Sequence, residues 1–156
     1  MKFFHRRILE MVMYMKNSMD LLSSVLKTTQ MGQAGIRSVL DASMRPALRK
    51  TLESQLREYE SIESEAYSLA TQRGWDLPEL DPAVRFFSDR MTRMKLNRGN
   101  CDSKIADMMI RGNTKGMISG LKNLHRYPHQ DDRISGICQK LLDCETANIR
   151  QMQTFL

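Results

Sequence analysis

Apolar residues recur every three or four positions along almost the whole chain, and this helical period narrows the choice of fold more than any other feature. The period runs through residues 4–43, 46–73, 82–98 and 103–127, and it returns in a last stretch after Asp131. No stretch alternates apolar and polar residues as a half-buried strand does. The sequence therefore predicts five helices and an all-α protein.

The breaks between these stretches predict how the helices connect. Pro46 and Pro82 suit the first turn of a helix, Gly74 suits a helix C-terminus, and Pro128 ends the fourth helical stretch. The first and last breaks are short, so each joins two antiparallel neighbours. The long segment 74–102 holds the short third helix. Two helical hairpins joined by one long crossover are typical of a ferritin-like four-helix bundle.

Helix lengths divide the chain into an extension and a bundle. The second, fourth and fifth helices span about 25–28 residues, near 40 Å at about 1.5 Å per residue. A first helix of matching length that ends at Ser43 would begin near Met19. Residues 1–18 would then overhang a bundle formed by 19–156. Two interpretations of 1–18 stay open: an artefact of the translation start, or a docking extension.

Several polar residues fall on the inward face of the predicted helices. They are Gln33, Gln55, Tyr59, Asn113, Glu145 and Asn148. Burying such groups without partners costs a few kcal/mol, roughly 1–3 by mutational measures. We therefore expect them to meet one another or a ligand.

The spacing of Glu145 and Asn148 resembles a metal-binding motif. Ferritin-like di-metal bundles use a Glu from each of two helices and Glu-x-x-His from the other two, and here asparagine replaces the histidine. Neutral amides are weak ligands for iron or manganese. The residues of this vestigial site are Gln33, Tyr59, Glu60, Glu63, Asn113, Glu145 and Asn148. We expect a hydrogen-bond network without bound metal; a weak metal site and an outward-facing register stay open.

Four segments of the chain resemble a group of small ferritin-like proteins of anaerobic bacteria, a domain of unknown function. The segments are KTTQMGQAGIRSVLD (27–41), LESQLREYESIESEA (52–66), SKIADMMIRGNTKGMISGLKNL (103–124) and KLLDCETANIRQMQTFL (140–156). Residues 70–83 are also loosely similar to the linker at a helix end of spore-coat ferritin-like proteins. The ferritin-like superfamily implies iron oxidation and storage, peroxide handling or DNA protection. The amides at the ligand positions depart from that pattern.

Gly112, Gly116 and Gly120 recur every four residues in the fourth helical stretch. Each glycine costs roughly 1 kcal/mol relative to alanine inside a helix. The usual use is close approach of another backbone, so we expect these glycines at a helix-packing surface. They do not form a phosphate-binding loop, because no Gly-Lys-Ser/Thr ending follows and no strand precedes them.

Composition places the chain among cytoplasmic helical proteins. No run approaches the roughly 18 apolar residues of a membrane span. The cysteine count is 3, which is odd, and no two cysteines form a CxxC pair, so we expect no disulfide framework and a reducing compartment. The net charge of +6 permits an acidic partner. The third stretch, 82–98, is the most basic part of the chain.

No catalytic motif stands out, so the leading hypothesis is a non-enzymatic bundle. It would act by self-association or by binding a protein, without a catalytic residue, cofactor or membrane. The first alternative is a metal-dependent oxidoreductase or iron-handling protein that uses iron or manganese at Glu60, Glu63 and Glu145. The second alternative is a basic bundle that associates with nucleic acid. Aromatic residues are not interleaved with its basic residues to stack bases.

Overall fold

The computed structural model describes residues 1–77, 101–128 and 130–156. This part of the chain forms four helices and no strand: α1 (Lys2–Val39), α2 (Pro46–Gln72), α4 (Asp102–Arg126) and α5 (Asp132–Gln153). The predicted all-α class is therefore confirmed for the described residues. The expected third helix, 82–98, lies outside them.

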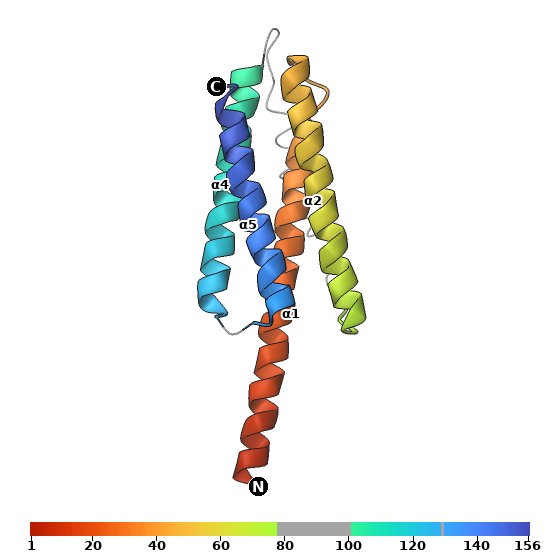
Figure 1. Ribbon diagram of the computed structural model, residues 1–156, viewed down its shortest axis with the longest axis vertical. Coiled ribbons are helices and arrows are strands. Elements are labelled where there is room, and N and C mark those ends of the chain that lie inside the picture. Colours follow the sequence, from red (N-terminus) through yellow and green to blue (C-terminus); the bar gives the residue numbers. More distant parts are fainter. Residues whose placement is uncertain (78–100, 129) are drawn as a thin grey trace.

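The helices form a bundle of two antiparallel hairpins (Figure 1). At one end, the Cys101 amide donates to the Ser43 carbonyl over 3.2 Å, and Arg45 lies over the Phe155 ring at 5.8 Å. At the other end, Arg73 pairs with Asp131. The helices α2 and α4 therefore run in the same direction.

Contacts between the helices define the order around the bundle. The pairs α1–α2, α1–α4, α2–α5 and α4–α5 are neighbours, and α1 also contacts α5 across the middle. The helices α2 and α4 occupy opposite corners. The hairpin partners are joined by short connections, 40–45 between α1 and α2 and 127–131 between α4 and α5.

Local chemistry explains where the helices begin and end. Pro46 occupies the first turn of α2, and Gly74 takes a left-handed φ of 68° directly after that helix. Asp131 caps α5, because its side chain accepts from the amides of Arg133 and Ile134, both at 3.0 Å. The end of α1 differs from the prediction. It lies at Val39 rather than residue 43, and the Arg49 guanidinium then bonds the Leu40 and Ala42 carbonyls in the turn.

An apolar core fills the space between the four helices. Its fully buried members come from every helix: Leu21, Leu22, Ile36, Val39, Leu48, Leu52, Ile62, Ile105, Ile134, Ile137 and Met152. The six polar residues placed on the inward faces by the sequence are buried among them. Their burial is thus confirmed.

The first helix is longer than the bundle. We call residues 1–16 the overhang: they are exposed throughout, and the first buried residue of α1 is Ser18. Figure 1 shows this segment, in red, projecting beyond the ends of the other helices. None of the described helices is long and apolar enough to cross a membrane.

Candidate functional site

Four polar side chains from three helices meet in the middle of the bundle. We call Tyr59 of α2, Asn113 of α4, and Glu145 and Asn148 of α5 the polar centre. Asn113 Oδ1 accepts from the Tyr59 hydroxyl at 2.8 Å and from Asn148 Nδ2 at 3.2 Å. Asn113 Nδ2 donates to the Met109 carbonyl at 2.7 Å, within its own helix. The amide of Asn113 therefore ties α2 and α5 to α4.

Glu145 is the one carboxyl group of the polar centre, and its side chain is only 2% exposed. Burial raises the pKa of Glu145 to about 8, although the nearby Tyr59 hydroxyl acts in the opposite direction. The pKa of Tyr59 is also raised, first by burial and then by Glu145. Glu145 Oε2 has no hydrogen-bond partner among the described residues. A protonated, neutral carboxyl group suits this environment near pH 7.

The other candidate residues belong to a second network, at the surface between α1 and α2. Gln33 Nε2 donates to Glu63 Oε2 at 2.7 Å, and Arg37 donates to Gln33 Oε1 at 3.2 Å. Arg37 also pairs with Glu60 at 2.8 Å. Gln33, Glu60 and Glu63 are thus organised around an arginine, and their hydrogen-bond partners include no member of the polar centre.

The seven residues of the anticipated vestigial site therefore divide between two networks. Within the described part of the chain, no group of three or more His, Cys, Asp or Glu side chains is placed to hold one metal ion. The guanidinium of Arg37, a cation, occupies the position beside Glu60. The arrangement offers hydrogen bonds and charge pairing rather than metal coordination.

Two of the three glycines of α4 pack closely against α5. A Cβ on Gly116 would lie 2.6 Å from Glu145 Oε1, and one on Gly120 would lie 2.9 Å from Leu142 Cδ2. Gly112 corrects the expectation for the whole series, because it is exposed and a Cβ there would meet nothing within 4 Å. Residues four apart drift by about 40° around a helix of 3.6 residues per turn, so the series turns away from α5.

A further close contact involves Gly32, a glycine inside α1. A Cβ on Gly32 would lie 2.5 Å from Cζ of the Tyr59 ring. The tyrosine thus lies flat against the α1 backbone and reaches Asn113 with its hydroxyl. Gly32 is the residue that lets Tyr59 enter the polar centre.

All three cysteines are buried, and two of them, Cys138 and Cys144, are unsuited to nucleophilic chemistry. Burial raises the pKa of the Cys138 thiol and of the Cys144 thiol to about 12. The thiolate, not the thiol, is the reactive form, so both side chains are inert near neutral pH.

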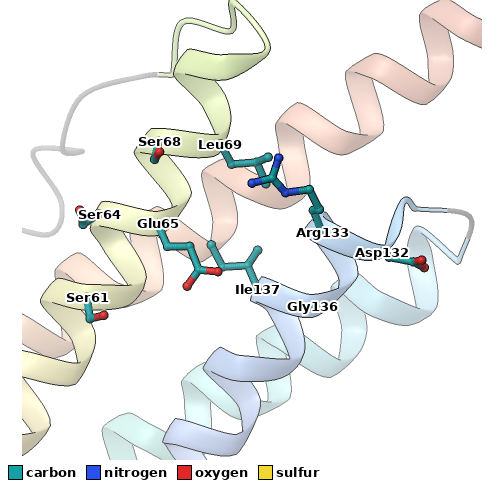
Figure 2. Close-up of a pocket in the computed structure, with 9 residues that line it drawn as sticks. All are labelled: Ser61, Ser64, Glu65, Ser68, Leu69, Asp132, Arg133, Gly136 and Ile137. Atoms are coloured by element: carbon teal, nitrogen blue, oxygen red, sulfur yellow. The ribbon is translucent and has the colours of Figure 1, made fainter.

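A shallow groove of about 550 Å³ runs between α2 and α5 (Figure 2). Ser61, Ser64 and Ser68 line its α2 side. Figure 2 shows the Glu65 carboxylate and the Arg133 guanidinium reaching across the gap, while Asp132 points away. Arg133 donates to Gln72 at 3.0 Å, and Glu65 pairs with Lys140 at 2.8 Å. These charged groups already have protein partners, so the groove offers little for a ligand.

The overhang carries most of the exposed large apolar residues of the described structure. Its ten large apolar residues are exposed: Met1, Phe3, Phe4, Ile8, Leu9, Met11, Val12, Met13, Tyr14 and Met15. Monomeric proteins rarely expose a contiguous apolar surface of this kind unless it binds something. The helix lengths predicted an extension at this position but did not identify its apolar residues as a binding site. The feature that could have identified them is the high density of apolar residues in a segment without a partner helix.

Comparisons with known proteins give no relative. No protein-family model matches the chain, and neither a curated protein nor a solved structure does.

Proposed function

We propose that this protein is a ferritin-like bundle that acts by binding another protein through its overhang. The exposed apolar helix of residues 1–16 carries the proposal. Its polar centre would hold the bundle together and perform no chemistry. This is a non-enzymatic role.

The connectivity supports the ferritin-like assignment. In that architecture two helical hairpins are joined by a connection that crosses the bundle. The parallel directions of α2 and α4 require such a connection here, since Arg45 and Asp102 pair at one end and Arg73 and Asp131 at the other. A simple up-down bundle would make α2 and α4 antiparallel.

The chemistry of the side chains in the polar centre supports a structural role rather than metal binding. Asn113 uses both atoms of its amide in hydrogen bonds to protein groups, and Asn148 uses its Nδ2, while Asn148 Oδ1 has no partner among the described residues. A carboxyl group whose pKa is raised to about 8 by burial is a poor ligand near pH 7, because metal binding requires the deprotonated form. The hydrogen bonds between helices give this cluster a sufficient purpose.

The overhang supports binding because it is costly without a partner. Helices in proteins gain most of their stability from packing an apolar face, and residues 1–16 have no such packing within the described chain. Phe3 is 86% exposed and Phe4 is 71% exposed. A protein surface that covers these side chains would remove their contact with water and stabilise the helix.

Site-specific photo-crosslinking in the cells that make the protein tests this function. A photoreactive amino acid replaces Val12, which is 54% exposed in the overhang, and a control carries it at the exposed Lys50 on the bundle. The proposal expects a discrete crosslinked protein from position 12, identified by mass spectrometry, and none from position 50. Crosslinks to lipid only, or no crosslink at position 12, would contradict it.

A further inference from the structure

We propose that the partner of the overhang is a second copy of this chain, paired in an antiparallel two-helix coiled coil. This inference rests on the proposed function and names its partner. Five apolar residues of the overhang follow the alternating spacing of three and four that defines a coiled-coil seam. They are Met1, Phe4, Ile8, Met11 and Met15, which are 109%, 71%, 40%, 59% and 43% exposed.

The overhang seam continues the core-facing stripe of the same helix without a change of phase. The next positions at the same spacing are Ser18, Leu22, Val25 and Thr29, all of them buried between the helices. A stripe that is buried against other helices inside the bundle thus becomes exposed where those helices end. On the N-terminal side of Ser18, none of the described elements covers the stripe. A helix from outside this chain would complete it.

The seam is complementary to itself in the antiparallel direction. When Ile8 of one copy lies opposite Met11 of the other, Phe4 lies opposite Met15 and Met1 lies opposite Ser18. The pairing is isologous, since both copies contribute the same residues. It ends where the bundle begins, so the overlap of about 16 residues extends for about 24 Å between two bundles at opposite ends.

The residues that flank the seam favour the antiparallel direction over the parallel one. In a parallel pair Arg7 would lie beside Val12 of the other copy, which offers no hydrogen-bond acceptor. In the antiparallel pair Arg7 faces Tyr14, which flanks the seam on the same side. The Tyr14 hydroxyl donates to Asp131 Oδ2 at 3.4 Å. That carboxylate already pairs with Arg73, so Arg7 of the second copy would meet the ring and hydroxyl of Tyr14 rather than a free carboxylate.

The distribution of side chains favours a second helix over a membrane surface. A helix that lies in a membrane interface keeps its basic residues on one face and its apolar residues on the other. Here Arg7 lies on the same side as the seam, one turn from Phe4 and Met11. Leu9 and Met13 lie on the opposite side, near the basic residues.

Cysteine pairing in the full chain tests the partner and its direction. We would prepare Ile8→Cys, Met11→Cys and, as a control on the bundle surface, Lys50→Cys. All three native cysteines are buried, and burial raises the pKa of the Cys138 and Cys144 thiols to about 12, so the native thiols do not compete under mild oxidation. The inference expects a disulfide-linked dimer mainly when the first two variants are mixed, and none from Lys50→Cys. Sedimentation should show a dimer that Ile8→Glu converts to a monomer.

Each other outcome overturns the inference. Equal linkage within Ile8→Cys alone would indicate a parallel pair. A monomer that binds vesicles containing anionic lipid would identify a membrane surface instead. A monomer whose position 12 crosslinks in cells to a different protein would refute the second copy while leaving the proposed function intact. Absence of dimer and crosslink together would refute both.

Discussion

Glu145 packs directly against Gly116, so that a Cβ at position 116 would lie 2.6 Å from the Glu145 Oε1 atom. The buried carboxyl group occupies the space that a side chain on α4 would fill. Gly32 and Tyr59 repeat this relationship between α1 and α2. The polar residues of the bundle therefore depend on glycines as much as on hydrogen bonds.

Gly32→Ala should destabilise the bundle by about 1–3 kcal/mol, the usual cost of overpacking a core. The new methyl group would collide with the Tyr59 ring, whose hydroxyl is held by Asn113. Gly112→Ala is the matched control, because nothing lies within 4 Å of a Cβ there. It should stabilise the helix by up to about 1 kcal/mol. Urea unfolding of both variants measures the difference, and equal effects would contradict the packing account.

The stability of the bundle should fall as the pH rises from about 4.5 to about 8. Burial raises the pKa of Glu145 from 4.5 to about 8, so the folded state holds a proton that the unfolded chain releases in this window. The free energy of unfolding then decreases by up to about 1.4 kcal/mol per pH unit. Below this window the carboxyl group is protonated in both states and has no such effect.

Glu145→Gln should remove this pH dependence and leave the variant more stable than the wild type at pH 8. The neighbouring titratable groups, Tyr59 and Cys144, have raised pKa values outside the window. The exposed Glu53→Gln is the control and should retain the wild-type profile. Urea unfolding at several pH values provides the measurement. A wild-type stability that stays flat or rises across the window would contradict the burial of a neutral carboxyl group.

Asp131→Ala should cost about 1–2 kcal/mol, because the side chain caps α5. It also pairs with Arg73, and the Arg73 hydrogen bond is the main reason that the pKa of Asp131 is lowered. This contribution is present above the ordinary aspartate pKa and is lost as the pH falls through the lowered value. The adjacent Asp132→Ala, at an exposed position, should cost less. Thermal unfolding near pH 7 compares the two, and a larger effect at Asp132 would refute the cap.

Two N-terminal deletions should separate the overhang from the bundle. Deleting residues 1–12 removes only exposed side chains and should leave the unfolding free energy of the dilute protein nearly unchanged. Deleting 1–20 also removes Ser18, whose hydroxyl bonds Gln130 at 2.6 Å, and should cost about 1–3 kcal/mol. Calorimetry of both truncated proteins measures this. A large loss from the shorter deletion would mean that the overhang belongs to the folded core.

The helical period of the sequence correctly predicted the burial of the polar side chains on the inward faces of the helices. Every polar residue assigned to an inward face is buried, because three-four spacing fixes the side of a helix that meets its neighbours. Glu60 and Glu63 were not among those residues: Glu60 pairs with the exposed Arg37, and Glu63 accepts from the buried Gln33.

Long-range geometry was not available from the period alone. Gly116 meets another side chain and Gly112 does not, because the drift of about 40° between them carries Gly112 out of the contact with α5. Where along α4 that contact lies depends on how α4 and α5 cross, which the spacing does not give. The contact of Gly32 with Tyr59 likewise joins two helices whose register no local signal sets. The early end of α1 at Val39 depends on Arg49, a residue of the next helix.

Hydrogen exchange of the backbone amides of residues 2–16 tests the central claim most directly, that another chain completes the overhang. At high concentration of the purified full-length protein these amides should exchange slowly, and they should exchange faster on dilution and in Ile8→Glu. The amides of residues 21–39, inside the bundle, should be unaffected by either change and serve as the internal reference. Fast exchange of the overhang at every concentration, or slow exchange that dilution does not alter, would contradict the account.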